Sequence, residues 1–403
     1  MNIYVNLFFS ILVVLVIITF KILNTKKNHN NYRGLFYRKS LVFNTFLYII
    51  AIFLFAYLFI INLKDHNVII SILNALSIAI LFIPSSINTL YKTSFKDEEE
   101  FSHLKYVITE DYDAKIVRKL NRAGISIIFL SETYDKAIPL DKLKDLDGNK
   151  NVTVNTKDYE EVFRIVGNSA YFEYLSDAYE TIRYSRGVHD NYIRTVKFNL
   201  AIYGGLFFSI CAMLIQGFPL YYNLFNACVF KVLTYLSAEY LYKHLTFDTD
   251  IMDRKPKPTN IFLGFQEILI SLIEAFCICF ALTIPYMYIL ASGGTINLTY
   301  TILTVTLLYS CIWLTYSYLS ERTFITNLIK SFKNKKLIII TICMIILTIL
   351  ICFIPKDGFI NIGLKNYMSA LLISLISIIF IEITKLARYT TTKGIKRNGS
   401  KDN

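Results

Sequence analysis

Long apolar runs are the feature that most constrains how this chain can fold. A helix of about 20 mainly apolar residues crosses the hydrocarbon core of a bilayer, which is about 30 Å thick. Nine runs of roughly this length occur, at 3–23, 41–63, 68–91, 197–216, 219–242, 261–291, 298–319, 337–354 and 366–387. Because 54% of the 403 residues are apolar and the mean hydropathy is +0.46, we expect a polytopic membrane protein with about nine spans.

The distribution of basic residues predicts the orientation of these spans. Lys and Arg cluster in alternate connections, at 21–39, 243–257, 322–336 and 385–401. The connections on the other side contain only three lysines, Lys64, Lys356 and Lys365. Cytoplasmic loops are rich in Lys and Arg, so we expect a multi-pass protein of the cell membrane with its N-terminus outside and its C-terminus in the cytoplasm. The net charge of +12 then reflects topology, and we expect no nucleic-acid partner.

One long polar block interrupts the apolar runs, at residues 92–195. Its pattern predicts a strand at 106–108, an amphipathic helix at 111–123 and a buried strand at 125–130. Gly124 is expected to end the helix. The inner face of the helix is expected to carry Ile116, Val117 and Leu120.

The chain therefore divides into four parts. We expect three membrane helices, a cytoplasmic α/β insertion, a six-helix membrane domain and a basic cytoplasmic tail, at 1–91, 92–195, 196–390 and 391–403. The fold class is mostly α: a transmembrane helix bundle with a small α/β insertion. The cysteines lie in or near apolar spans and are interpreted as small apolar residues. We expect neither a metal site nor a cofactor.

Four ionisable residues inside predicted spans form the candidate site: Lys231, Glu239, Glu267 and Glu274. Lys231 and Glu239 share one helical face, and Glu267 and Glu274 share another. A charge at the bilayer centre costs about 2.5–3.5 kcal/mol, so such residues usually pair. One interpretation is a structural pair between Lys231 and Glu274, which lie at similar depth. The other is an ion or proton pathway.

A polar stretch between two apolar runs carries the most specific motif. Residues 250–258 read D-I-M-D-R-K-P-K-P, and the prolines must end any helix there. The stretch resembles the D-I-M-x-R-x-P-x-x-P turn between the sixth and seventh membrane helices of type II P-type cation-transporting ATPases, such as the calcium pumps. Other segments resemble this family at 185–191, 332–336 and 381–388. His189 replaces a tyrosine of the family's signature and is expected on the surface.

The polar block resembles the same family. Residues 115–130 are similar to the second half of the pumps' phosphorylation domain, so the resemblance implies a remnant of a HAD-like domain. The sequence departs from the family at its catalytic motifs, because S-E-T at 131–133 replaces T-G-D and neither D-K-T-G-T nor T-G-E-S occurs. Only residues 85–105 separate Pro84, which matches the proline of the fourth helix, from the strand at 106–108. The nucleotide domain has no room there.

The positions that hold cations in the pumps have changed too. By the resemblance, the ligands of the sixth helix fall on Lys231, Thr234 and Tyr235, and those of the fifth on Tyr203 and Leu206. A hard cation needs several oxygen ligands, mostly charged. The resemblance therefore implies no catalytic residue and no metal ligand in this chain.

Three functions are consistent with these observations. The first is a non-catalytic relative of the ATPases that acts by binding or regulation, in contact with the lipid bilayer and with another membrane protein or a full-length pump. The second is ion transport without ATP, which flux in proteoliposomes would reveal. The third is the membrane subunit of a split ATPase, which a neighbouring gene encoding D-K-T-G-T would favour. We expect no magnesium-dependent ATPase activity from the chain alone.

Overall fold

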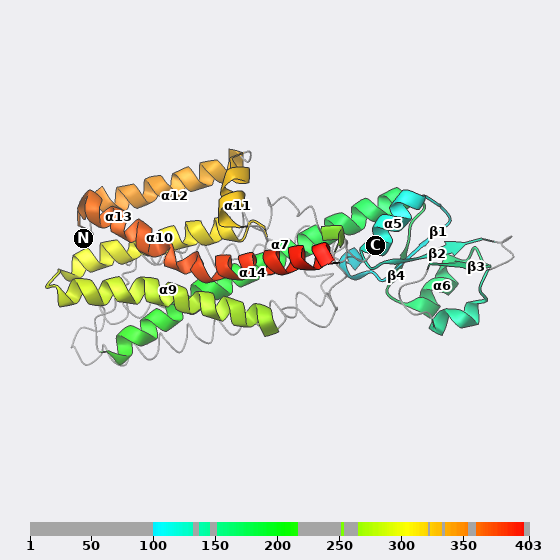
Figure 1. Cartoon of the computed structure of the whole chain (residues 1–403), viewed down its shortest axis with the longest axis horizontal. Coiled ribbons are helices and arrows are strands. Elements are labelled where there is room, and N and C mark those ends of the chain that lie inside the picture. Colours follow the sequence, from blue (N-terminus) through cyan, green and yellow to red (C-terminus); the bar gives the residue numbers. More distant parts are fainter. Residues whose placement is uncertain are drawn as a thin grey trace, which may run out of the picture. The chain divides into compact units, whose positions relative to one another are not determined.

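The computed structural model describes eight segments of the chain (Figure 1): residues 100–131, 137–145, 151–216, 251–253, 265–320, 323–332, 335–353 and 360–398. Two compact units are present. The α/β unit comprises Lys92–Ile193 and Leu245–Phe262, and the helical unit includes Arg194–His244 and Leu263–Asn403. The predicted spans at 3–23, 41–63, 68–91 and 219–242 lie outside the described residues, so the predicted number of nine spans stays a prediction.

The α/β unit contains four parallel strands in the order β3-β2-β1-β4. They are β1 (Tyr106–Thr109), β2 (Ser126–Leu130), β3 (Val152–Val154) and β4 (Ser169–Tyr171). Helix α5 (Ala114–Arg122) joins β1 to β2, and α6 (Tyr159–Val166) joins β3 to β4. Three short 3-10 helices complete the unit: η2 (Glu100–His103), η3 (Leu140–Asp145) and η4 (Ile251–Asp253). The predicted strand–helix–strand pattern is confirmed.

The sequence explains the bounds of α5. Asp113 caps its N-terminus, with the side chain accepting from the Lys115 N–H at 2.7 Å. Val117 and Leu120 face the core as predicted, with 8% and 0% of their surface exposed. Gly124 has φ 73°, a conformation that glycine adopts without strain, so the chain turns there into β2.

Apolar side chains cover both faces of the sheet. On one face Val107 and Ile127 pack with α5, with the start of α7 (Leu175–Ile215) and with η4. On the other face Ile108 and Ile128 pack with η3 and α6. Figure 1 shows α5 and α6 on opposite sides of the strands. This alternation follows from the period of two along each strand.

The D-I-M motif supplies part of this core. Ile251 and Met252 are 3% and 6% exposed and pack in the cluster that contains Val117 and Leu120. The apolar pair in an otherwise polar stretch is thus explained by burial in the α/β unit.

One residue of the 185–191 signature does not lie where the sequence predicts. His189 is only 5% exposed, and its ring packs edge-on against that of His103, 4.8 Å between centroids. The expectation that His189 lies on the surface was wrong. The physical reason is that α7 begins at Leu175, well before the apolar run, so residue 189 belongs to a helix that packs within the α/β unit.

In its described residues, the helical unit contains the second half of α7 and six further helices: α9 (Phe265–Ala291), α10 (Ile296–Ser317), α11 (Phe324–Ser331), α12 (Lys335–Phe353), α13 (Gly363–Ser374) and α14 (Ile376–Asn398). Among the described residues, four stretches are long and apolar enough to cross a membrane: Leu175–Met213, Glu267–Ala291, Ile296–Ser317 and Gly363–Ala387. A shorter apolar helix covers Leu337–Leu350. These helices support a membrane protein.

Helix α10 is buried along most of its length and packs against α9, α11, α12, α13 and α14. Most of its threonine and serine hydroxyls are accommodated because they bond to backbone carbonyls of the same helix. Thr301, Thr306 and Ser310 donate to carbonyl oxygens four residues earlier, at 2.9, 2.8 and 2.9 Å. The hydrocarbon core of a bilayer offers no water to a hydroxyl group, and these intrahelical bonds satisfy the hydroxyls instead.

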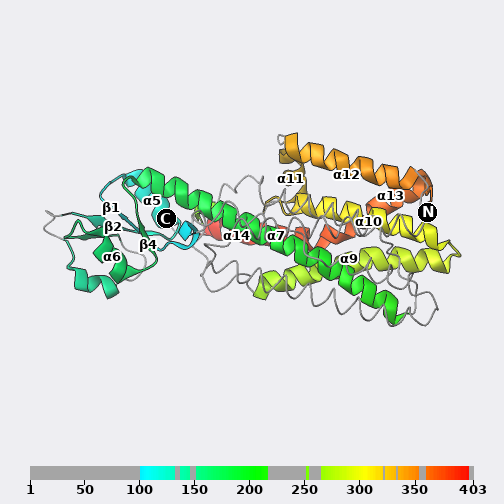
Figure 2. The same cartoon turned by 180° about the vertical axis from the view of Figure 1, so that it is seen from behind.

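Helices α7 and α9 approach closely through small residues, and Figure 2 shows them side by side. A Cβ atom added to Gly205 would lie 2.6 Å from Ile278 Cβ, and one added to Gly204 would lie 2.8 Å from Ala275 Cβ. Phe208 stacks on Phe276, with centroids 4.3 Å apart. Small residues allow this approach in membrane bundles.

Candidate functional site

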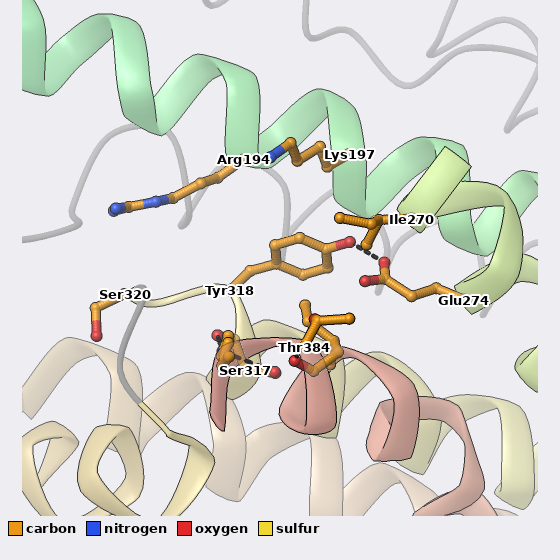
Figure 3. Close-up of a pocket in the computed structure, with 10 residues that line it drawn as sticks. Arg194, Lys197, Ile270, Glu274, Ser317, Tyr318, Ser320 and Thr384 are labelled. Atoms are coloured by element: carbon orange, nitrogen blue, oxygen red, sulfur yellow. Dashed lines mark hydrogen bonds between the residues drawn. The ribbon is translucent and has the colours of Figure 1, made fainter. Parts of the chain in front are cut away.

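A polar pocket lies at the C-terminal end of α10, within the helical unit (Figure 3). Helices α7, α9 and α14 and the turn after α10 form its walls. Its charged and polar lining includes Arg194, Lys197, Glu274, Ser317, Tyr318 and Lys385. Three of these side chains are cationic and one is a carboxyl group, so the pocket is the place where the charges of this unit meet.

Lys385 links α14 to the end of α10. Its Nζ donates to the Ser317 carbonyl oxygen, to Ser317 Oγ at 3.1 Å and to Glu382 Oε1 at 3.0 Å. Glu382 also accepts from Ser317 Oγ and from the Phe324 N–H, both at 2.6 Å. Only 6% of the Lys385 side chain and 18% of that of Glu382 are exposed. The pair therefore joins α14, α10 and the start of α11 away from bulk water.

The last carbonyl groups of α10 explain why donors gather there. A helix leaves its final carbonyls without intrahelical partners, and its C-terminus carries a partial negative charge. Arg194 Nη1 donates to the carbonyl of Leu319, in the turn that follows α10, at 3.3 Å. Asn327 Nδ2 donates to the Tyr316 carbonyl at 3.2 Å. Together with Lys385, these side chains satisfy the end of α10 and the turn after it from three other helices.

Glu274 lines the pocket and is fully buried, with 0% of its surface exposed. The Tyr318 hydroxyl donates to Glu274 Oε2, and Figure 3 shows the ring of Tyr318 pointing from the end of α10 toward α9. The Tyr318 ring also packs edge-on against Phe198 of α7, with centroids 6.3 Å apart. Tyr318 thus connects the buried carboxyl group to the charged end of the pocket.

Glu267 lies one turn closer to the start of α9 than Ile270, which lines the pocket. Its Oε1 is 3.1 Å from Lys197 Nζ, and the two side chains are 23% and 14% exposed. This ion pair connects α7 to α9 beside the close contact of Gly204 and Gly205. Because both groups keep some exposure, water can partly solvate either charge, so removing one partner costs less than it would in a fully buried pair.

The structure places two of the four predicted site residues. Glu274 lines the pocket and Glu267 adjoins it, each with a partner that the sequence did not suggest. Lys231 and Glu239 lie outside the described residues, so the predicted pair between Lys231 and Glu274 stays a prediction. Sequence reasoning missed Lys197 because it begins an apolar span.

The missed partners on α14 left a signal in the sequence. Glu382 and Lys385 stand three residues apart near the end of an apolar run, which is a spacing for contact on one helical face. Tyr318 and Arg194 left no comparable signal, because their contacts are with residues far away in the chain.

The carboxyl edge of the sheet is the second place where function could reside, since open α/β sheets bind ligands there. Three helices begin at this edge, and a helix N-terminus attracts phosphate. Here each N-terminus already has an aspartate. Asp113 accepts from Lys115 N at 2.7 Å in α5, Asp158 accepts from Glu160 N at 2.9 Å in α6, and Asp111 accepts from Leu175 N at 3.0 Å in α7.

The same edge is acidic around β1 and β4. Partial burial and the nearby carboxylates of Glu110 and Glu173 raise the pKa of Tyr171, the last residue of β4. Tyr171 also stacks on Tyr159, with centroids 4.7 Å apart. Burial raises this pKa without any nearby charge, but the two carboxylates add negative charge to the edge, and that charge disfavours a bound phosphate.

One family model matches the chain. Residues 246–387 match the model described as Cation transporting ATPase, C-terminus. The matched range contains the D-I-M motif, helices α9 to α13 and α14 as far as Ala387. No curated protein matches this chain. The resemblance stated from the sequence motifs is confirmed for this range, which corresponds to a C-terminal membrane region of a P-type cation-transporting ATPase.

Proposed function

We propose that this chain is a non-catalytic membrane protein, built on the membrane region of a P-type cation-transporting ATPase, that acts by binding or regulation. The observation that carries the proposal is the carboxyl edge of the parallel sheet. Asp111, Asp113 and Asp158 fill the three helix N-termini there, and the carboxylates of Glu110 and Glu173 adjoin it. A phosphoryl group would meet carboxylates where it needs donors.

The spacing inside the chain supports the same proposal. Residues 85–105 are too few to hold a nucleotide domain between Pro84 and β1, and the sequence contains no D-K-T-G-T. The end of β2 leads to Ser131 in place of the pumps' T-G-D. Without an aspartyl nucleophile and a phosphate-binding loop, the chain lacks the groups that couple ATP to transport.

The described membrane carboxylates support a structural role. Glu267 is paired with Lys197, and Glu274 accepts from Tyr318. Both contacts join helices to one another, whereas a hard cation needs several oxygen ligands around one point. The proposal therefore gives these carboxylates no part in transport, and it holds that the protein acts in the cell membrane beside another membrane protein or a full-length pump.

Nucleotide binding tests the proposal. The full-length chain in detergent is titrated with Mg-ATP, with a competent P-type pump in the same detergent as the positive control. We expect no saturable binding at millimolar nucleotide. Saturable binding that ADP displaces would contradict the account of the acidic edge, because aspartates already bond to the three helix N-termini described there.

Ion movement without ATP is the second candidate, and the buried position of Glu274 beside an open pocket favours it. The test is flux of protons and monovalent or divalent cations into proteoliposomes without nucleotide. Flux that the Glu274→Gln variant loses and the Lys365→Gln variant keeps would replace the first proposal. Lys365 is exposed on α13. Its variant controls for flux lost through the purification and reconstitution of a variant protein.

A further inference from the structure

The pocket at the end of α10 presents more cationic than anionic groups. Arg194 and Lys197 project from α7 and Lys385 from α14, while Glu274 is the one carboxyl group among the lining residues. The Tyr318 hydroxyl already donates to Glu274, which reduces the negative potential that this carboxyl group adds. The partners Glu267 and Glu382 lie outside the lining. Since Lys197 and Lys385 each have one of these carboxylates as a partner, at 3.1 and 3.0 Å, the lining offers an anion hydrogen-bond donors and no large excess of positive charge.

The accessible cation is Lys197. Its side chain is 14% exposed, and its described contact is the ion pair with Glu267, which is itself 23% exposed. A lysine has three donors and a flexible four-carbon stem, so it can contact a ligand without leaving Glu267. Arg194 is 6% exposed and presents a planar group that suits phosphate oxygens.

The surroundings of the pocket are apolar on the outside of the bundle. Helix α9 exposes Phe265 and Leu269, and α14 exposes Ile383 and Leu386. In the sequence, the end of α10 is followed by the basic cluster at 322–336, one of those that we expect on the cytoplasmic side. The cytoplasmic leaflet is rich in anionic lipids, and basic pockets between membrane helices bind their headgroups.

We propose that this pocket binds the phosphate group of an anionic phospholipid, with Arg194 and Lys197 as the phosphate contacts and the outer faces of α9 and α14 against the acyl chains. A free phosphate ester shares the charge chemistry but gains nothing from these apolar faces. The proposal does not rest on the absence of catalysis, and either can fail without the other.

The test uses the full-length protein, delipidated in a neutral detergent. Phosphatidylglycerol, phosphatidylcholine and inorganic phosphate are added separately, and the thermal unfolding midpoint and the lipid retained in native mass spectrometry are measured. We expect phosphatidylglycerol to raise the midpoint and to be retained, and the other two to do neither. Equal stabilisation by phosphatidylcholine, or by inorganic phosphate, would overturn the assignment.

Variants locate the site. Lys197→Gln and Arg194→Gln should each weaken phosphatidylglycerol binding about fivefold, which corresponds to about 1 kcal/mol per cation near an anionic surface. Lys335→Gln removes an exposed lysine at the start of α12 and should leave binding unchanged. If Arg194→Gln does not fold, Lys197→Gln alone decides. Undiminished binding in Lys197→Gln, or the same loss in Lys335→Gln, would refute the pocket as the site.

Discussion

Replacing Lys385 with methionine should destabilise the helical unit more than any other removal of a single lysine from α9 to α14. Methionine keeps the length of the side chain but removes the donors to Ser317 and the charge that faces Glu382. Glu382 then stays 18% exposed without its cation. Stranding one partner of a buried pair costs about 3–5 kcal/mol in soluble proteins, whereas single hydrogen bonds in membrane bundles average about 0.6 kcal/mol.

These two values bound the stability that the Lys385→Met variant should lose. Lys385 makes three contacts and loses a charge pair, so we expect Lys385→Met to cost about 2–4 kcal/mol. At about 2 °C per kcal/mol, the unfolding midpoint in detergent should fall by about 4–8 °C. The double variant Lys385→Met with Glu382→Gln should cost less than the sum of the two single variants, with a coupling of about 1–3 kcal/mol.

The control is Lys365→Met, which removes an exposed lysine from α13 and should change stability by less than about 0.5 kcal/mol. Strictly additive costs in the Lys385 and Glu382 cycle would refute the reasoning. So would a Lys385→Met variant as stable as Lys365→Met, because the ion pair would then contribute nothing to the packing of α14 on α10.

Three further predictions concern the membrane helices. Gly205→Leu should destabilise by about 1–3 kcal/mol through the contact with Ile278, measured by thermal unfolding, and an unchanged midpoint would contradict the close α7–α9 packing. Asn199→Leu should leave stability unchanged or raise it, because the asparagine side chain is 1% exposed and has no hydrogen-bond partner among the described residues. A large loss of stability would show that the amide group makes a hydrogen bond. Lys231→Met and Glu274→Gln should show coupled costs in a double-mutant cycle, and additivity would remove the predicted pair.

Much of the local structure follows from the sequence. The strand–helix–strand pattern of β1, α5 and β2 was predictable because short alternating runs and Gly124 mark each element. The helices α9, α10 and α12 were predictable because each coincides with a long apolar run in the sequence. The burial of Ile251 and Met252 in the α/β core was not predictable. That core combines residues that precede the fourth predicted span with residues that follow the fifth.

The partners at the pocket were harder to predict for a physical reason. Which face of a helix meets which neighbour depends on rotation about its axis and on packing, and neither is encoded in hydropathy. Tyr318 reaches Glu274 across 44 residues of chain, and Lys385 reaches Ser317 across 68. The sequence predicts that a buried carboxyl group at Glu274 needs a partner. It does not predict that the partner is Tyr318, because that depends on where α10 ends.

Phosphoenzyme formation tests the central claim most directly. The purified full-length chain is incubated with Mg²⁺ and γ-labelled ATP, quenched in acid and analysed for covalently bound label, beside a competent P-type pump handled identically. The account predicts no acid-stable label and no magnesium-dependent hydrolysis above the level of a mock purification. Stoichiometric acid-stable labelling that hydroxylamine releases would contradict it, because an acyl phosphate would then form on a chain that we propose lacks the aspartyl nucleophile.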